Sequence, residues 1–300
     1  MTRLLITGAT GFIGEPAVRL AAETFEVHGT ARGTHAKTQA AFYRCDLLNT
    51  RDVTRLIEDV RPTHLLHLAW IATPGVYWAS PENHRWVEAS KHLLLAFARC
   101  GGRRAVLAGT CAEYDWSVAG VCHEHDTPTH PHTTYGRCKL ELGRWAETFG
   151  NARGIAVARA RLFFIYGPRE YPARLVPSVA NALLNGASAA CSAGTQERDF
   201  LHVEDVADAI VALTRSDLTG PVNIGSGEAV AVRDVIECVA HASGRPELVR
   251  LGARETPANE PAILVADVNR LRDELGWRPR IALASGLCET ANWWRLNRAA

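Results

Sequence analysis

The sequence has few of the features that mark secreted or membrane proteins. Its eight cysteines are scattered without any Cys-x-x-Cys pair, which argues against a disulfide framework and a thiolate zinc site. The first apolar run, Leu4-Leu5-Ile6, is too short for a signal-peptide core or a membrane span. No low-complexity tract marks a disordered tail. We therefore expect a folded, cytoplasmic protein with reduced, mostly buried cysteines.

An excess of charge of either sign is also missing. Lys and Arg total 33 against 32 Asp and Glu, so the net charge of +1 gives no reason to expect nucleic acid or an anionic membrane as a partner. The hydrophobic fraction of 47% is that of an ordinary globular protein. A local binding site for a small anion remains compatible with this balance.

What the sequence does contain is an alternation of short apolar runs and amphipathic stretches. Strand-like runs are expected at residues 4–6, 26–31, 42–45, 64–69, 105–109 and 155–162. Helical spacing of apolar residues is found between them at 52–59, 83–99 and 134–149. Strands that alternate with helices predict an α/β fold, a doubly wound parallel sheet of the Rossmann type with right-handed crossovers.

The first strand leads directly into a glycine-rich turn, Gly8-Ala9-Thr10-Gly11-Phe12-Ile13-Gly14. Its glycines are spaced three and three, whereas the familiar dinucleotide fingerprint is spaced two and three. Both spacings permit a tight turn, a close approach of backbone to a pyrophosphate, and N–H groups at a helix N-terminus. A purely structural turn is the alternative, but the position between strand and helix favours a dinucleotide site.

Beyond residue 165 the rhythm of the elements loosens. Tyr166-Gly167-Pro168 ends a strand, whereas residues 204–225 again resemble a helix and strand of the sheet. We therefore expect a dinucleotide-binding domain over 1–165, to which 204–225 returns. A smaller, sequence-interleaved C-terminal substrate-binding lobe is expected over 166–300.

The end of the second strand distinguishes the two nicotinamide cofactors. A carboxylate there bonds the ribose 2′-hydroxyl of NAD(H), whereas an Arg accommodates the 2′-phosphate of NADP(H). The strand carries no carboxylate near its end and is followed by Arg32, whose fork suits phosphate. The alternative is that Arg32 is a solvated loop cation. We predict NADP(H) in preference to NAD(H).

Tyr135 and Lys139 lie four residues apart, hence on one face of a helix that begins after the capping candidates Thr133 and Thr134. A phenol with a pKa near ~10 is a poor acid–base at neutral pH, and a neighbouring cation lowers that pKa toward the working range. The strand 105–109 ends at Thr110, whose hydroxyl can hold a substrate oxygen beside Tyr135. These residues form the predicted catalytic site.

Several motifs, in order along the chain, match one family. They are residues 7–14 (TGATGFIG), His67-Leu68-Ala69, Thr110, the Tyr-x-x-x-Lys pair, Tyr166-Gly167-Pro168 and residues 198–206 (RDFLHVEDV). On these motifs the sequence resembles the extended short-chain dehydrogenase/reductases that act on nucleotide sugars. The resemblance extends to Leu275-Gly276-Trp277-Arg278-Pro279. It implies an NAD(P)-dependent oxidoreductase with a nucleotide-diphosphate sugar as substrate.

The resemblance also implies residue roles. Tyr135 would exchange a proton with the sugar, Lys139 would bond the nicotinamide ribose and tune Tyr135, and Thr110 would fix the reacting oxygen. The implied cofactor site comprises Gly8, Thr10, Gly11, Phe12, Ile13, Gly14, Arg32, Asp46, Leu47, Leu68, Ala69, Tyr135, Lys139 and Phe163. The implied substrate contacts are Thr110, Tyr135, Phe164, Arg174 and Arg198. For Arg174, a surface cation near a loop is the alternative.

The sequence departs from the family at three places. Sugar-nucleotide 4,6-dehydratases of the family carry Asp-Glu after the Thr, but Cys111-Ala112 follows Thr110, which argues against dehydration. Glu113 is not expected to substitute, because strand-like alternation would aim it elsewhere. Phe164 replaces an Asn that many epimerases use on the substrate phosphate, and residues 258–261 (Ala-Asn-Glu-Pro) replace an Arg-Pro-Gly-Asp stretch.

Two side-chain groups near the predicted site have alternative interpretations. Trp116 could stack on a sugar face, although an aromatic after a strand is as often part of the core. Histidines 123, 125, 130 and 132 crowd one segment, which suggests metal binding. That segment is rich in Pro and Thr and matches the ordinary loop before the family's Tyr, so we predict no metal site.

Three functions compete. Arg32, the missing dehydratase acids and the altered epimerase residues favour an NADPH-dependent reductase of a 4-keto-6-deoxy nucleotide sugar. The alternative is a nucleotide-sugar 4-epimerase that retains NAD(H), and a second is a non-catalytic dinucleotide-binding sensor, although such proteins commonly lack the Tyr and Lys. A homodimer is expected through helices 83–99 and 134–149, with residues 93–95 (Leu-Leu-Leu) as apolar surface.

Overall fold

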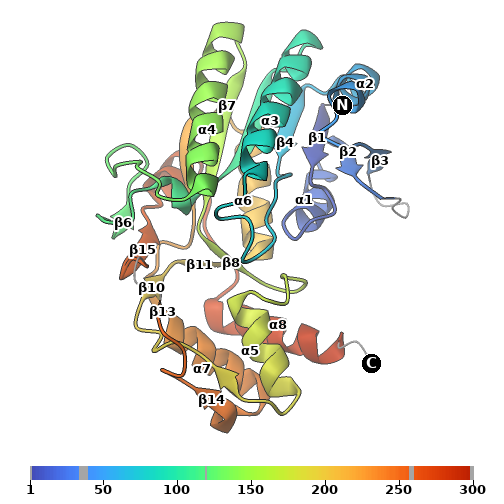
Figure 1. Ribbon diagram of the computed structural model, residues 1–300. Helices are drawn as coiled ribbons and strands as arrows, with labels where there is room; N and C mark the ends of the chain where they lie inside the picture. Colours follow the sequence, from blue (N-terminus) through green and yellow to red (C-terminus); the bar gives the residue numbers. More distant parts are fainter. Residues whose placement is uncertain (1, 34–39, 119, 257–259, 298–300) are drawn as a thin grey trace.

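The computed structural model describes residues 2–33, 40–118, 120–256 and 260–297. The chain forms an upper lobe built on a large sheet and a lower lobe of helices and short strands (Figure 1). The large sheet has seven strands in the order β12-β7-β5-β4-β1-β2-β3, paired in parallel throughout. They are β1 (Arg3–Thr7), β2 (Glu26–Ala31), β3 (Ala41–Arg44), β4 (His64–His67), β5 (Arg104–Thr110), β7 (Ala156–Leu162) and β12 (Gly220–Ile224). The predicted doubly wound parallel sheet is confirmed.

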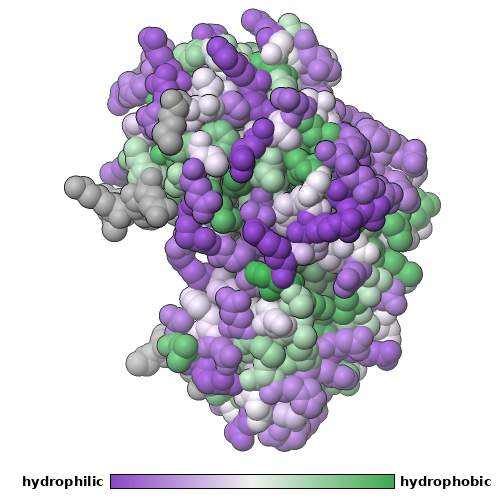
Figure 2. Space-filling view, turned by 180° about the vertical axis from the view of Figure 1, so that it is seen from behind, coloured by the Kyte–Doolittle hydropathy of each residue, from purple (hydrophilic) through white to green (hydrophobic). Residues whose placement is uncertain are grey.

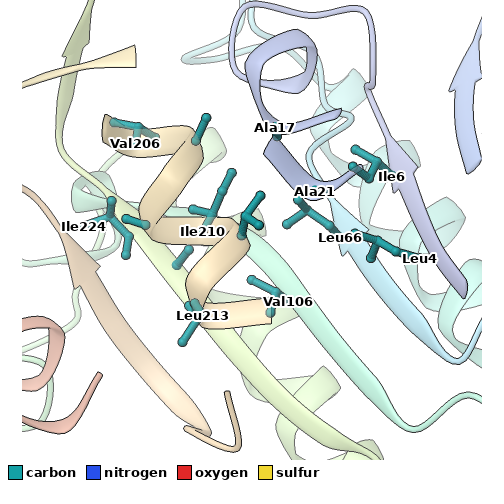
Figure 3. Close-up of a cluster of buried hydrophobic side chains, with 14 of the residues drawn as sticks. Leu4, Ile6, Ala17, Ala21, Leu66, Val106, Val206, Ile210, Leu213 and Ile224 are labelled. Carbon is teal, nitrogen blue, oxygen red and sulfur yellow. The ribbon is translucent and has the colours of Figure 1, made fainter. Parts of the chain in front are cut away.

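Helices cover both faces of this sheet. Their bounds are α1 (Gly14–Ala21), α2 (Thr50–Val60), α3 (Glu82–Arg99), α4 (Thr134–Arg153) and α6 (Val203–Arg215). Side chains alternate between the faces of a strand, so Leu4 and Ile6 pack with α1 and α6 whereas Leu5 packs with α2, α3 and α4. Figure 3 shows the first cluster, in which Val206 and Ile210 of α6 lie among the strand residues.

Local sequence fixes the ends of α4, the helix that carries the predicted catalytic pair. It begins after Thr133, whose hydroxyl accepts the Gly136 N–H at 3.0 Å, so the predicted cap at Thr133 is confirmed. It ends at Gly154, which adopts a φ of +67° that glycine accommodates best. The helix therefore continues past the expected end at residue 149 to Arg153.

The lower lobe is a helical layer beside short strands. Its helices α5 (Leu175–Leu184), α7 (Val232–Ser243) and α8 (Leu283–Leu296) pack on one another around a separate hydrophobic cluster. Its short strands are β6 (Val121–Cys122), β8 (Phe164–Tyr166), β9 (Ala189–Ala190), β10 (Glu197–Arg198), β11 (Phe200–His202), β13 (Val230–Ala231), β14 (Val249–Arg250) and β15 (Ile263–Ala266). Single turns are η1 (Cys111–Glu113), η2 (Pro246–Leu248) and η3 (Arg270–Glu274).

The chain passes between the lobes more than once. After β7 it enters β8, which pairs with β11 at the waist, and it then returns through α6 to β12 at the edge of the large sheet (Figure 1). Further on, β15 pairs with both β10 and β6. The predicted boundaries, 1–165 with 204–225 against 166–300, stay a prediction.

The leucines of α3 do not provide the apolar surface expected of them. Leu93 and Leu94 are each 1% exposed and belong to the core between α3 and the sheet, and Leu95 is half-buried. An amphipathic helix buries the side chains that face the sheet, and these consecutive leucines are on that side. Elsewhere, Figure 2 shows hydrophilic residues over most of the upper lobe on the face opposite to that of Figure 1. No helix in the described ranges is long and apolar enough to cross a membrane.

Candidate active site

The turn between β1 and α1 requires glycine at two positions. Gly8 has a φ of +69°, and a Cβ on it would lie 2.9 Å from the Ala69 backbone nitrogen. A Cβ on Gly14 would lie 2.0 Å from the Gly8 carbonyl oxygen. No side chain caps α1 at Ile13. Backbone N–H groups at an uncapped helix N-terminus are suited to a pyrophosphate.

A chain of hydrogen bonds holds the end of β4 against this turn. The Ala69 N–H donates to the Thr7 hydroxyl (3.3 Å), and Thr7 Oγ1 lies 2.7 Å from Nδ1 of His67. His67 Nε2 lies 2.8 Å from the Ser90 hydroxyl, which donates to the Trp86 carbonyl. Burial, assisted by the Lys139 ammonium, lowers the pKa of His67 to about 3 and keeps it neutral. Leu68 and Ala69 therefore lie next to the glycine turn, as the predicted cofactor site requires.

The other residues predicted to bind the cofactor lie at the same edge of the sheet, where the parallel strands end. Arg32 directly follows β2 and is exposed, with no hydrogen bond or ion pair to any described residue. Asp46 follows β3 and is exposed, and its carboxylate accepts the Leu48 N–H at 3.0 Å. Leu47 beside it is buried. At the turn, Thr10 and Gly11 are exposed, and Phe12 and Ile13 are half-buried.

The three predicted catalytic residues lie together at the end of β5 and the start of α4. Thr110 is the last residue of β5, and its side chain lies near enough to the Tyr135 phenol to lower the pKa of that phenol. The Lys139 ammonium donates to the Ala108 carbonyl at 2.9 Å and lies 3.9 Å from the centre of the Trp70 ring. Its nitrogen is 6.0 Å from the centre of the Tyr135 ring. A hydroxyl, a phenol and an ammonium are thus placed on one side of the β5 end.

The pKa values of the pair differ from the sequence prediction. Burial raises the pKa of Tyr135 well above its ordinary value, with Tyr77 adding to the shift and the nearby Thr110 side chain opposing it. Burial lowers the pKa of Lys139 to about 7, against the opposing charge of Glu113. The pKa of Tyr135 is thus raised by burial and not lowered by Lys139 as expected, and the Lys139 ammonium is bonded to the Ala108 carbonyl.

Aromatic side chains that the sequence analysis missed surround Tyr135. The Tyr77 ring meets it edge-on at 4.8 Å between centres, and the Trp78 ring does so at 5.7 Å. Trp78 also contacts Trp116 at 5.9 Å, and the Tyr135 N–H donates to the Trp78 carbonyl. The signal available in the sequence was the aromatic content of residues 70–78 (WIATPGVYW), just after the fourth strand.

The predicted substrate residues approach the same region from the lower lobe. The guanidinium of Arg174 lies 5.4 Å from the Tyr77 ring centre, and its Nη1 is 3.5 Å from the Tyr77 hydroxyl. Arg198 is 2% exposed and lies 5.5 Å from the Phe164 ring centre. Its Nη2 is 2.9 Å from a carboxylate oxygen of Glu260, an ion pair without an aligned hydrogen bond. Of the replaced stretch 258–261, Ala258 and Asn259 lie outside the described residues.

The remaining predicted residues are accounted for as follows. The Phe163 side chain is buried beside Tyr114, in a cluster that also contains Cys111. Trp116 is half-buried and donates its indole N–H to the Cys111 carbonyl at 3.2 Å. Histidines 123, 125, 130 and 132 are exposed, and the described part of the chain contains no group of three potential metal ligands.

Strand alternation was expected to aim Glu113 away from the site, but residues 111–113 are not part of a strand. The strand ends at Thr110, and residues 111–113 form the turn η1 instead, in which Glu113 is fully buried. Its side chain accepts the Thr110 N–H at 2.9 Å while the Thr110 hydroxyl accepts the Ala112 N–H at 3.2 Å. This reciprocal capping box closes the end of β5 that carries the predicted catalytic Thr110.

A parallel sheet with an uncapped glycine turn after β1, and a Thr, Tyr and Lys gathered at the end of β5, define an oxidoreductase of the extended short-chain dehydrogenase/reductase class. The chain belongs to the NAD dependent epimerase/dehydratase family, whose sequence profile matches residues 4–225. The predicted family and enzyme class are thereby confirmed.

Similar proteins include enzymes of more than one activity. The chain is 27% identical over 319 residues to a UDP-glucose 4-epimerase of Streptomyces lividans, covering 97% of this chain and 95% of that protein. It is 29% identical to a dTDP-6-deoxy-L-talose 4-dehydrogenase (NAD(P)(+)) of Kitasatospora kifunensis, covering 96% and 94%. The crystal structure of a Thermus thermophilus UDP-glucose 4-epimerase in complex with NAD superposes with a TM-score of 0.86 at 27% identity, covering 99% of this chain and 100% of that one.

Proposed function

We propose that this enzyme is an NADPH-dependent reductase of a 4-keto-6-deoxy nucleotide sugar. The observation that carries the proposal concerns the residues at the end of β5. Thr110 and Tyr135 are present there, but residues 111 and 112 offer no second acid and base. Glu113, the nearest carboxylate in the sequence, is occupied by the Thr110 N–H and two arginines. Such a site can deliver a proton to a carbonyl oxygen without performing an elimination.

The cofactor assignment follows from the residues at the sheet edge. The glycine turn and the N-terminus of α1 would bind the pyrophosphate, and Arg32 would bind a 2′-phosphate. Leu68 and Ala69 would contact the cofactor through their backbone, and Lys139 would bond the nicotinamide ribose. When bound, the nicotinamide supplies the hydride for C4. NADP(H) in preference to NAD(H) rests on Arg32 and the lack of an acid at the end of β2.

The proton would come from Tyr135. A pKa held above its ordinary value keeps the phenol protonated at neutral pH, so a proton is present for the C4 oxygen, but it also makes Tyr135 a weaker acid than an ordinary phenol. Thr110 would hold that oxygen beside the phenol. Arg174 and Arg198 would bind the substrate diphosphate, for which paired guanidinium groups are well suited.

The relatives favour one alternative, a nucleotide-sugar 4-epimerase that retains NAD(H) and uses the same Tyr135 and Lys139. A non-catalytic sensor is disfavoured by the presence of both residues. The test is a screen of NADPH and NADH oxidation against a panel of 4-keto nucleotide sugars. A reductase oxidises one NADPH per ketosugar consumed. A protein that purifies with tightly bound cofactor and interconverts 4-epimers with none added would overturn the proposal in favour of the epimerase.

A further inference from the structure

Glu113 lies directly behind the catalytic hydroxyl. Its carboxyl group is fully buried, and Oε1 accepts the Thr110 N–H at 2.9 Å. The neighbouring Gly109 makes room for this carboxylate, because a Cβ there would lie 2.5 Å from Oε1. Two features of the chain, the glycine and the turn η1, therefore bring a negative charge to the end of β5.

Two arginines of the neighbouring strand hold the other carboxylate oxygen. Oε2 of Glu113 accepts Arg159 Nη1 at 3.1 Å and Arg161 Nε at 3.0 Å. Both arginines project from the same face of β7, two residues apart, and Arg161 is directly opposite Gly109 in the sheet register. Each has a further anchor, since Arg159 bonds Glu147 and Arg161 bonds the Glu124 carbonyl. The carboxylate is thus restrained at both oxygens.

The orientation of the Thr110 hydroxyl depends on this arrangement. The hydroxyl accepts the Ala112 N–H and lies beside the Tyr135 phenol, so its direction follows the backbone of residues 110–112. Glu113 fixes that backbone from the other side of the capping box. A buried ionic cluster is weak evidence of stabilisation, since apolar side chains of similar volume usually serve as well. A role in geometry explains the cluster better.

We infer that Glu113 is a positioning residue, which holds Thr110 so that its hydroxyl stays aligned with Tyr135 during proton transfer. The inference rests on the proposed function, because it concerns the same catalytic hydroxyl. Arg159 and Arg161 act behind it as the restraint on the carboxylate. The Glu113 charge also raises the pKa of Lys139 and Tyr135 on α4, so its removal has an electrostatic effect that a change of shape alone does not.

The test compares Glu113→Asp with Glu113→Gln. The aspartate keeps the counter-charge for both arginines but is too short to keep both the Thr110 N–H and the arginines in reach. We expect it to lower kcat by about 10- to 100-fold with KM changed by less than about threefold, as misplacement of a reacting group does. The glutamine removes the negative charge that raises the pKa of Lys139, so it should in addition lower the pH at which kcat/KM for NADPH declines. The aspartate keeps the charge and should leave that pH unchanged. Glu274→Gln, which removes the carboxylate partner of Arg270 and contacts neither Glu113 nor its two arginines, is the matched control and should keep wild-type turnover.

A double-mutant cycle decides whether Glu113 acts through Thr110. In a Thr110→Ala background, Glu113→Asp should change kcat by less than about twofold, because the hydroxyl it positions is gone. An equal loss in both backgrounds would overturn the inference. Hydrogen exchange of the Thr110 amide tests it without any substrate. Faster exchange in Glu113→Asp, with cooperative unfolding preserved, supports the inference even if no ketosugar is reduced, and unchanged exchange overturns it.

Discussion

At the scale of single residues, Tyr135 is the group on which the proposed chemistry depends most directly. Tyr135→Phe removes the phenol proton but keeps the ring between Tyr77 and Trp78. We expect kcat for ketosugar reduction to fall by about 10²- to 10⁴-fold, the usual contribution of a general acid, while the loss of cofactor affinity through the missing hydroxyl contact should be much smaller. The absorbance of NADPH during turnover measures kcat, and a fluorescence titration measures the cofactor affinity. Tyr43→Phe, which removes a phenol that bonds His28, is the control, and undiminished turnover in Tyr135→Phe would contradict the mechanism.

Arg32 tests the cofactor assignment at a residue with no described partner. Arg32→Ala should weaken NADPH binding by about ten- to a hundredfold, since a charge-assisted contact with the 2′-phosphate is lost, and should leave NADH binding unchanged. Titration of both cofactors against both proteins measures the difference. Arg55→Ala, which removes another exposed cation from α2, controls for the change in net charge. Equal weakening of both cofactors, or equal affinity of the wild-type protein for the two, is the result that rejects NADP(H) preference.

Lys139 predicts a pH dependence. Burial lowers its pKa from the ordinary value of 10.5 to about 7, so the ammonium is protonated below that pH and loses its proton above it. If the cationic form bonds the nicotinamide ribose, kcat/KM for NADPH should fall as the pH rises through about 7, since this parameter reports the free enzyme. Lys139→Arg keeps its charge throughout and should lose the descending limb. A level profile in the wild-type protein over the same range contradicts the assignment.

Which site residues could be predicted from the sequence depended on how local their signals are. Gly8 and Gly14 could be predicted because both belong to one short turn of the chain. Tyr135 and Lys139 could be predicted because four residues along a helix bring them to one face. Tyr77 reaches Tyr135 through a loop whose path is set by tertiary contacts, so no spacing rule identifies it. The pKa of Tyr135 was mispredicted for a related reason, because burial is a property of the fold.

At the scale of elements, the glycine turn makes a prediction about stability. Gly14→Ala adds a methyl group 2.0 Å from the Gly8 carbonyl oxygen, which the start of α1 cannot accommodate without moving. We expect a loss of about 1–3 kcal/mol in the free energy of unfolding, as for other overpacked sites, together with weakened cofactor binding. Urea titration followed by circular dichroism measures the first. Gly120→Ala is the control, because open space surrounds a Cβ there, and equal stability of the two variants would contradict the close approach.

The elements of the large sheet and the lower-lobe helix α5 were predictable from the sequence, whereas the short strands of the lower lobe were not. Strand 26–31 coincides with β2, since its alternation is reinforced by turn residues on both sides. The two-residue strands β6 and β10 are formed by pairing with β15, from a distant part of the chain, and β10 pairs with β13 as well. The strand expected at 64–69 is shorter in the structure, where β4 ends at His67. It ends there because Leu68 and Ala69 leave the sheet to meet the glycine turn.

At the scale of the whole molecule, we predict a homodimer formed through α3 and α4. These helices lie side by side on one face of the sheet, and their outer surfaces carry charged residues such as Lys91 and Glu141, which pair across the two helices. The interface must therefore be more polar than Leu93 and Leu94 suggested. Light scattering coupled to size-exclusion chromatography should give twice the chain mass of 32.7 kDa. A mass of one chain refutes the dimer.

The pairing of β15 with β6 and β10 has a consequence for how such enzymes can diversify. Strands from residues 121–122, 197–198 and 263–266 meet in one small sheet, while β12 at 220–224 completes the large one. A single genetic crossover between two homologues would therefore join halves of both sheets that never evolved together. Transplanting the lower lobe between homologues therefore requires several coordinated exchanges. If Phe164, Arg174 and Arg198 bind the substrate as proposed, point substitutions there are the more accessible route to a new specificity.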